Sequence, residues 1–321
     1  MELVVTILAG ITLLVILILL FGPRPTLDPS VPATSVPAGL SPSDLATWLA
    51  EHEAAHGAVI DGAEATIQWA DGPDVQDLCL LYVHGFSASR QETSPLSERI
   101  AAEVGANAVF TRLAGHGLDA GAMEAAAEHW LQSMVDSWEI ASRIGRKVII
   151  IAVSTGAPLS IWLNQHVAER DKVHSFIFLA PNFKVRNPFA FLLTWPWSPV
   201  WLTRLLGEHS WEPENELAAR YWTHRYSSHA VIEMQKVVDW ARRTELDAGD
   251  IPLATLYMEG DPTISHEAAV AFHEAWDAEN KALHRVTLDA DNPQHVFVGD
   301  ITAPHRVDWC VERCVEFIKN V

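Results

Sequence analysis

Cysteine and basic residues are both scarce in this 321-residue chain. Its three cysteines are Cys79, inside an apolar run, and Cys310 and Cys314, which are spaced one helical turn apart. This spacing is no disulfide framework, so we interpret all three as packing thiols. Only 22 Lys and Arg residues stand against 41 Asp and Glu residues, a formal net charge of −19. A chain with this much negative charge repels nucleic acid and anionic lipid headgroups. We therefore expect no nucleic-acid partner, and we favour neutral or hydrophobic partners.

No charge occurs in residues 3–21, a run of 19 residues rich in Leu, Ile and Val. This is about the length of helix that crosses a bilayer, so we expect residues 1–21 to be a single-pass transmembrane anchor. A cleaved signal peptide is the alternative, but no Lys or Arg precedes the run and the small-residue cleavage candidates lie well beyond it. The flanking charges are too few to assign the side of the membrane on which the domain lies.

Six prolines and no apolar periodicity characterise residues 22–42. This composition predicts a semi-extended linker. At its end, Ser41, Pro42 and Asp44 resemble the capped start of a helix. We therefore expect residues 43–321 to form one domain, for which a hydrophobic content of 49% supplies a sizeable core.

Apolar strand patterns alternate with helical patterns along most of this domain. The predicted strands span residues 65–69, 78–83, 108–111, 148–153, 174–179, 253–258 and 283–288. The predicted helices that separate or follow them span residues 93–104, 122–144, 157–168, 267–278 and 305–318. Such alternation predicts an α/β fold, in which a mainly parallel sheet is flanked by helices on both faces.

Residues 182–248 interrupt this alternation. The segment is rich in tryptophan and holds six of the thirteen in the chain: Trp195, Trp197, Trp201, Trp211, Trp222 and Trp240. Large aromatic side chains in one inserted segment suit a helical cap over a cleft, where their rings bury apolar ligand surface. A small helical subdomain with a core of its own explains the same composition, and the sequence leaves both interpretations open.

Ser154 lies where the strand predicted at 148–153 meets a helical pattern. A serine at such a junction can cap the helix, or it can be a nucleophile held on a sharp turn. The sequence A-V-S-T-G at 152–156 resembles the small-x-Ser-x-Gly nucleophile elbow of the α/β-hydrolases, with Ala152 where the common form has glycine. Small residues are needed there because the strand and helix backbones approach each other closely.

The resemblance extends to three other predicted strand ends. The sequence H-G-F that follows the strand at 78–83 resembles the His-Gly-x stretch beside the elbow, and it implies an oxyanion hole formed by the backbone N–H groups of Phe86 and Thr155. Asp261, in a Glu-Gly-Asp turn, looks like the acid of the catalytic triad, and His295 follows the final strand where these enzymes have their histidine. The chain order Ser, Asp, His agrees with that fold.

Other carboxylates compete with Asp261 for the role of the triad acid. Glu259 is the nearest rival, and Asp289 and Asp291 lie close to His295 in the sequence. Both predicted strand ends therefore carry acidic residues that could orient the histidine.

The sequence R-L-A-G-H-G at 112–117 resembles the Arg-x-x-Gly-His-Gly loop of lipase-like and esterase-like α/β-hydrolases. We interpret its histidine, His116, as a structural residue that orients a loop beside the site. The whole resemblance covers about residues 65–319. Within the superfamily it is nearest to bacterial carboxylesterases and to the monoacylglycerol lipase and serine aminopeptidase-like group.

The sequence H-E-A-A-H at 52–56 matches the H-E-x-x-H pattern of zinc peptidases. Two histidines one helical turn apart can bind zinc, but a catalytic site needs a third ligand, and the metzincin continuation is absent. The segment also precedes the hydrolase core. We therefore predict no metal site there and regard the match as chance in a chain with fifteen histidines.

These features together predict a membrane-tethered serine hydrolase that needs no metal or organic cofactor and acts on hydrophobic carboxylic esters, including monoacylglycerol-like lipids. An amidase or aminopeptidase with the same triad is one alternative, and an acidic cap could recruit an ammonium group through Glu208, Glu212, Glu214 and Glu216. A membrane-anchored binding protein without catalysis is the other.

Overall fold

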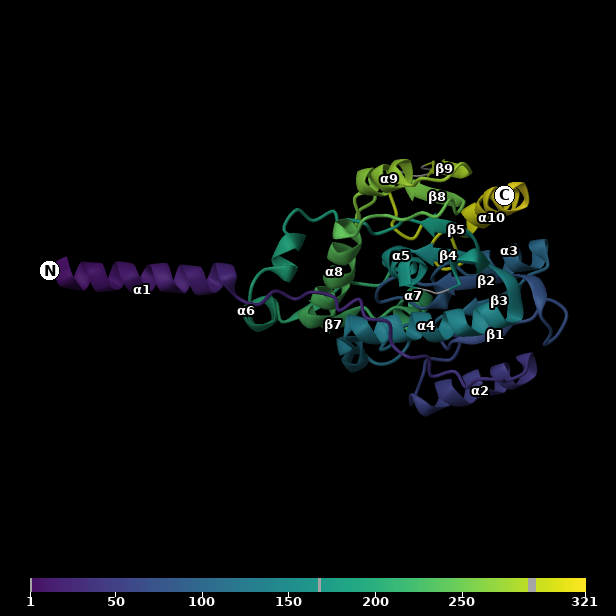
Figure 1. Ribbon diagram of the computed structural model, residues 1–321, viewed down its shortest axis with the longest axis horizontal. Coiled ribbons are helices and arrows are strands. Elements are labelled where there is room, and N and C mark those ends of the chain that lie inside the picture. Colours follow the sequence, from purple (N-terminus) through teal and green to yellow (C-terminus); the bar gives the residue numbers. More distant parts are fainter. Residues whose placement is uncertain (1, 167–168, 288–292) are drawn as a thin grey trace.

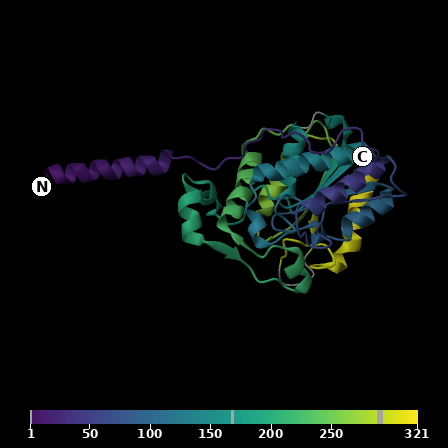
Figure 2. The ribbon, with the colours of Figure 1, turned by 90° about the horizontal axis from the view of Figure 1, so that it is seen from below.

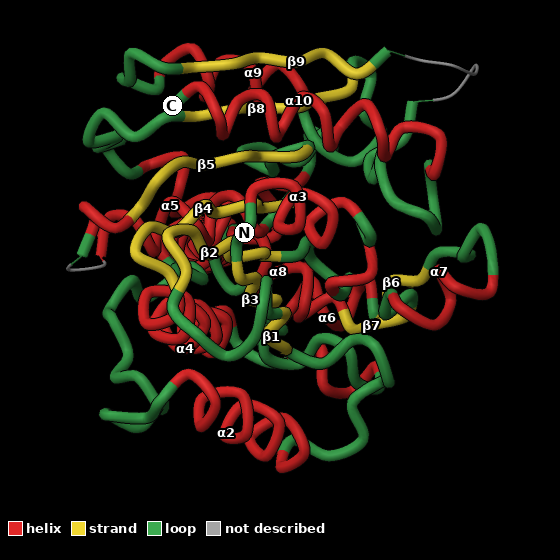
Figure 3. The backbone as a smooth tube through the Cα atoms, turned by 90° about the vertical axis from the view of Figure 1, so that its right-hand side faces the viewer, coloured by secondary structure: helices red, strands yellow, loops and turns green. Residues whose placement is uncertain are grey.

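The computed structural model describes residues 2–166, 169–287 and 293–321. Within these residues, one sheet is built from the strands β1 (Thr66–Gln68), β2 (Gln76–Val83), β3 (Asn107–Phe110), β4 (Gly145–Val153), β5 (Val173–Leu179), β8 (Leu253–Met258) and β9 (Lys281–Val286). Their order across the sheet is β1-β3-β2-β4-β5-β8-β9, and Figure 3 shows this succession from β9 at the top to β1 below. β1 runs antiparallel to β3, and the remaining neighbours are parallel.

Helices cover both faces of the sheet, as the alternation predicts. They are α2 (Pro42–Ala55), α3 (Leu96–Val104), α4 (Ala127–Ile144), α5 (Gly156–His166), α9 (His266–Ala275) and α10 (Val307–Asn320). Side chains alternate along the central strands: Leu81 and Ile150 pack on the face that α4 and α5 cover, whereas Leu80 and Ile149 pack on the face that α3 and α10 cover. Burial on both faces explains the uninterrupted apolar runs of β2 and β4.

The predicted strands are all present, and most predicted helices differ from the observed ones by a few residues. The last strand begins at Lys281, two residues before its predicted start, and its predicted end at 288 lies outside the described residues. The helix predicted at 122–144 is wrong at its start. The Asp119 side chain accepts hydrogen bonds from Gly121 N and Ala122 N and so caps a short 3₁₀ helix, η2 (Ala120–Glu124), after which α4 begins afresh.

The inserted segment forms a cap beside the main domain. It consists of the 3₁₀ helix η4 (Ala190–Thr194), the helices α6 (Ser198–Leu206), α7 (Glu216–Tyr221) and α8 (Ser228–Arg243), and a two-stranded sheet of β6 (Glu208–Ser210) and β7 (Arg225–Ser227). α8 joins the cap to the domain, since Glu233 Oε2 accepts a hydrogen bond from Ala127 N at 2.8 Å and Lys236 pairs with Glu128 at 3.0 Å.

The proline-rich linker has no helix or strand between α1 and α2, and it is not a free tether. Asp136 on α4 accepts hydrogen bonds from Thr34 Oγ1 at 2.9 Å and from the backbone N–H of Ser35 at 2.7 Å. Leu27 and Val36 are buried against the domain. At its end the Ser41 side chain caps α2 by accepting a hydrogen bond from Asp44 N, as the sequence predicts. The linker is therefore docked along the surface of the domain.

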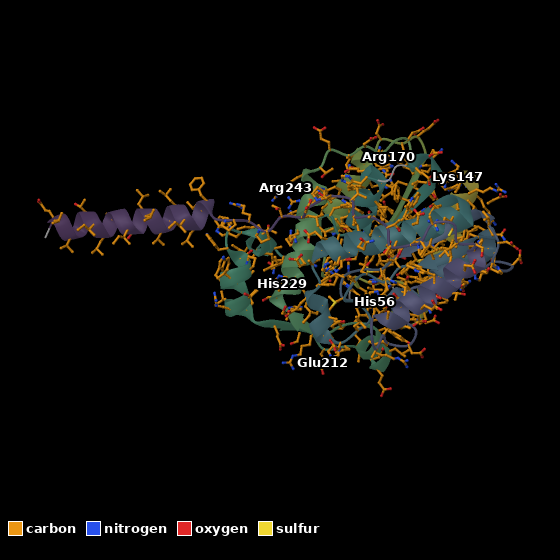
Figure 4. The ribbon with its side chains drawn as sticks, turned by 60° about the horizontal axis from the view of Figure 1, so that its bottom comes forward. His56, Lys147, Arg170, Glu212, His229 and Arg243 are labelled. Atoms are coloured by element: carbon orange, nitrogen blue, oxygen red, sulfur yellow. The ribbon has the colours of Figure 1, made fainter. Side chains whose placement is uncertain are left out.

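The N-terminal helix α1 (Glu2–Phe21) projects from the domain as a rod, as Figure 1 shows. None of its residues is buried, and its side chains extend into open space over most of its length (Figure 4). With a mean hydropathy of 3.2 over its most apolar window, it is long and apolar enough to span a membrane.

Candidate active site

Ser154 lies in the turn between β4 and α5 and has a left-handed backbone conformation, with φ 51°. This conformation is uncommon for a residue with a side chain. The turn is sharp because α5 packs closely on β2: a Cβ added to Gly156 would lie 2.5 Å from the carbonyl oxygen of Val83. Ala152 is fully buried on β4, so its methyl group is accommodated where related turns have glycine.

The structure brings the three predicted triad residues into one hydrogen-bonded series. His295 Nε2 lies 2.9 Å from Ser154 Oγ, and His295 Nδ1 lies 2.8 Å from Asp261 Oδ2. The second carboxylate oxygen of Asp261 accepts hydrogen bonds from the backbone N–H groups of Thr263 and Ile264. Asp261 is buried, and these bonds hold its carboxylate in one orientation toward the imidazole.

The nearest rival to Asp261 lies elsewhere. Glu259 is exposed and pairs with Arg285 at 2.9 Å, so the backbone turn after β8 directs the two carboxylates to different surroundings. Asp289 and Asp291, the other rivals, lie outside the described residues.

Phe86 and Thr155, the predicted oxyanion-hole residues, line the same cavity as Ser154. Among the residues that the structure describes, neither backbone N–H donates to a protein acceptor. Two unpaired N–H groups beside a serine hydroxyl can stabilise negative charge on an oxygen that reacts there. The loop that carries Phe86 also touches the cap, because Thr223 N donates to the Ser87 carbonyl at 2.7 Å.

A cavity of about 490 Å³ lies above Ser154 and His295. Such a volume is within the range of roughly 300–1,000 Å³ typical of small-molecule sites. The cap forms one wall with Trp211, Trp222 and Tyr226, and the Tyr226 ring packs edge-on against Phe86 at 5.2 Å.

The six tryptophans of the cap are divided between two roles. Trp211 and Trp222 line the cavity, whereas Trp195, Trp197, Trp201 and Trp240 lie away from it. Trp201 donates to the Pro196 carbonyl within the cap, and Trp240 packs against the main core. The insertion therefore forms one wall of the cavity, and its helix α8 packs into the main core.

Comparison with solved structures assigns this fold to a known architecture. One structure of the metagenome-derived lipolytic enzymes LipS and LipT has a TM-score of 0.65 at 16% identity, covering 82% of this chain and 100% of that one. The monoacylglycerol lipase of Paleococcus ferrophilus has a TM-score of 0.57 at 15% identity, over 80% of this chain and 100% of that one. A soluble variant of the monoglyceride lipase of Saccharomyces cerevisiae has 0.60 at 10% identity, over 80% and 91%.

The chain has the α/β-hydrolase fold. No protein-family model matches its sequence, and no curated protein matches it either. The likeness is therefore one of structure, and it confirms the fold that the elbow motif predicts.

Asn182 is a residue of this candidate site that the sequence analysis missed. It follows β5, its backbone N–H donates to the Ser154 carbonyl at 3.0 Å, and its side-chain Nδ2 donates to Thr155 Oγ1 at 3.2 Å. Its buried Oδ1 has no partner among the described residues, and Asn182 lines the cavity. Its position at the carboxyl end of a parallel strand is the signal that could have identified it.

The H-E-x-x-H segment lies at the C-terminal end of α2 and contacts the loop at residues 112–117. Glu53 is buried and forms a two-pronged ion pair with Arg112, at 2.5 and 2.9 Å, and Arg112 also donates to the His116 carbonyl. His52 and His56 face each other, with 3.2 Å between their Nε2 atoms. Across the described part of the chain, no three His, Cys, Asp or Glu side chains gather as metal ligands.

Two buried histidines pack beneath the loop that follows β2. His84 Nε2 accepts a hydrogen bond from Leu113 N at 3.1 Å, so its Nδ1 carries the proton and donates to the Gly85 carbonyl. Burial lowers the pKa of His84 to about 4. The His116 ring lies tilted against the His84 ring, with 5.0 Å between their centroids, and burial together with that neighbour lowers the pKa of His116 well below the usual value. Both stay neutral near pH 7, in keeping with the predicted structural role of His116.

Glu92 is a second residue that the sequence analysis missed. It is buried in η1 (Arg90–Glu92), and its Oε1 accepts hydrogen bonds from Gly85 N at 2.7 Å and from Tyr82 Oη at 3.0 Å. Gly85 immediately precedes Phe86, so Glu92 holds the backbone that presents the Phe86 N–H. Burial raises the pKa of this carboxyl to about 7. Nothing in the sequence around Glu92 distinguishes it from a surface residue.

The buried Glu92 carboxyl should make stability fall as the pH rises. Its pKa is about 7 in the folded protein against an ordinary 4.5, so between these values the folded state holds a proton that the unfolded state has lost. That favourable contribution is complete below pH 4.5 and is lost as the pH rises through 7. Glu92→Gln keeps the Oε1 acceptor and removes the titration. Its unfolding free energy relative to wild type should therefore rise by about 3 kcal/mol between pH 4 and 8.

Urea unfolding across this pH range measures the difference. Glu103→Gln on the exposed face of α3 is the matched control for loss of one carboxylate. A Glu92→Gln effect that does not change with pH would contradict the assignment.

Proposed function

We propose that this α/β-hydrolase is a serine hydrolase that cleaves carboxylic esters. The observation that carries the proposal is the hydrogen-bonded series from Asp261 through His295 to Ser154, which opens into the capped cavity. The backbone N–H groups of Phe86 and Thr155, which have no protein acceptor among the described residues, lie at the same cavity. A nucleophile, a base, an orienting acid and oxyanion donors are the parts that acyl transfer requires.

In the proposed reaction, His295 Nε2 accepts the Ser154 proton as the serine oxygen bonds to the acyl carbon. The carbonyl electrons move to the oxygen, where each N–H of the oxyanion hole contributes about 3 kcal/mol. The bond to the alcohol oxygen then breaks, and the alcohol leaves with the proton from His295. Water attacks the acyl-enzyme by the same steps and releases the acid. Asp261 stabilises the imidazolium and fixes the proton on Nδ1 until then.

We infer that the substrates are hydrophobic esters. Trp211 and Trp222 give the cavity apolar walls, and solved structures similar to this chain include enzymes described as lipolytic and as monoacylglycerol lipases. We also infer that α1 anchors the domain in a membrane, because it is uncharged after Glu2 and wholly exposed. Lipid esters partition into bilayers and would be concentrated at such an anchor.

An amidase or aminopeptidase is the second candidate, and one observation favours it. Glu212 and Glu214 line the cavity, and neither forms an ion pair among the described residues. Figure 4 shows Glu212 at the outer edge of the domain. Two carboxylates at the rim could attract a substrate with an ammonium group.

Covalent labelling of Ser154 tests the proposed chemistry. A fluorophosphonate probe should label the full chain, and Ser154→Ala should abolish labelling and lower kcat for p-nitrophenyl esters by about a thousandfold or more. Ser160→Ala is the matched control, since Ser160 is a buried serine of α5 whose hydroxyl bonds to the Gly156 carbonyl. A folded chain that stays unlabelled would instead support a binding protein without catalysis.

Replacement of the acid separates Asp261 from its rival. Asp261→Asn removes the charge that fixes the imidazole tautomer, so kcat should fall on the order of 10⁴-fold while the fold is retained. Glu259→Gln should leave kcat unchanged, because Glu259 faces Arg285 on the surface. Equal losses in the two variants would refute the assignment of Asp261.

A substrate series measures the class of acyl group. With p-nitrophenyl esters from acetate to decanoate, kcat/KM should rise with chain length, because each methylene buried against the aromatic wall adds about 0.8 kcal/mol. Aminoacyl p-nitroanilides in the same assay should be poorer substrates. A strict preference for acetate would overturn the hydrophobic-substrate proposal, and a preference for anilides would favour the aminopeptidase.

A further inference from the structure

Exposed apolar side chains outside α1 concentrate in one part of the cap. Ten large hydrophobic residues of the described domain and linker are exposed, and six of them lie between residues 189 and 206. We call these six the cap apolar surface: Phe189, Phe191, Trp197, Val200, Leu205 and Leu206. The exposed fractions reach 72% for Leu205 and 66% for Phe189. The other four, Val31, Val75, Leu217 and Leu283, lie in separate elements. Exposed apolar side chains gathered in one segment are typical of an interaction surface.

The cap apolar surface is continuous with the end of the N-terminal helix. Trp197 Nε1 donates to the Ile18 carbonyl at 3.0 Å, and Trp197 N donates to the Pro23 carbonyl at 2.9 Å. The indole lies so close to the chain at Gly22 that a Cβ there would be 1.7 Å from Trp197 Nε1. Figures 1 and 2 both show η4 and α6 beside the end of α1 that meets the domain.

The linker keeps this arrangement in place. Arg24 lies over the Trp195 ring at 5.3 Å, and the following residues are strapped to the domain by the hydrogen bonds from Thr34 and Ser35 to Asp136. The domain therefore cannot swing away on a flexible tether without breaking these contacts. Where α1 ends, the cap apolar surface is beside it.

We propose that the cap apolar surface is a second membrane-contact surface, which enters the interface of the bilayer that α1 spans. The occupant is a phospholipid surface of neutral headgroups, since a net charge of −19 opposes binding to anionic lipid. Tryptophan and arginine at the end of an apolar helix are typical of the membrane interface, and Trp197 and Arg24 occupy that position. Exposed leucine and phenylalanine side chains gain free energy by burial at the acyl boundary. The inference rests on the proposed anchor and not on catalysis.

A short stretch of the chain connects the cap apolar surface to the cavity. α6 ends at Leu206, β6 begins at Glu208, and His209 and Trp211 line the cavity. A cap held in the interface would therefore place one wall of the cavity within a few residues of the lipid.

Site-specific fluorescence on the full chain in phosphatidylcholine vesicles tests the proposal. The three native cysteines are buried, so a single introduced cysteine can be labelled with the environment-sensitive dye NBD. In Leu205→Cys the dye should be quenched several-fold more strongly by bromine on lipid acyl chains than in Leu283→Cys, an exposed position on β9. It should also be protected from iodide in the water. Leu217→Cys in α7 is a second control within the cap.

The outcomes are distinct. A dye at 205 that is as accessible to iodide as the dye at 283 overturns the proposal. Protection from iodide without quenching by brominated lipid also overturns it, because a second copy of the chain would then cover the surface. Phe189→Cys repeats the measurement from η4 in case the Leu205 variant does not fold. Neither readout uses enzyme activity, so a failure here is distinguishable from failure of the proposed hydrolase chemistry.

Discussion

The close contact between α5 and β2 is the constraint on which the site depends. Gly156 packs against the Val83 carbonyl, and the chain can pass from β4 into α5 only through the left-handed conformation of Ser154. The same contact places the end of β2 next to the elbow, so that the Phe86 and Thr155 N–H groups share one cavity with the serine hydroxyl. The position of the candidate nucleophile and that of its candidate oxyanion donors thus have one physical origin.

Buried polar groups hold the loop after β2 where this contact requires it. Burying them is unfavourable unless each is paired, and here the pairs run from Glu92 to Gly85, from His84 to Leu113 and from Glu53 to Arg112. The glutamate of the H-E-x-x-H segment is one member of this set, which gives that segment a structural explanation. The loop is therefore held from several directions by hydrogen bonds rather than by apolar packing alone.

The central fold and the triad candidates were predictable from the sequence because their signals are local. Fully buried strands appear as apolar runs, and Ser154 and Asp261 each follow such a run directly or within a few residues. His295 instead follows β9, a half-exposed strand in which exposed residues alternate with partly or fully buried ones. Glu92 and Asn182 were missed because their roles depend on partners that the fold supplies. The predicted start of α4 was wrong because Asp119 caps a separate short 3₁₀ helix. Apolar spacing alone does not show that one helical pattern is divided into two helices.

The docking of the linker was equally hidden, because contacts such as that of Ser35 with Asp136 join residues about a hundred positions apart and leave no periodic pattern. Its consequence extends beyond the linker. A free tether would let the domain sample every orientation relative to α1, and the exposed residues of the cap would then have no defined neighbour. Because the linker is docked on the domain, α1, the cap and the cavity keep fixed positions relative to one another. Exposure of the apolar side chains of Leu205 and Phe189 is unfavourable in water. If α1 is in lipid, the docked linker holds these side chains near the same membrane interface, and their burial there is favourable.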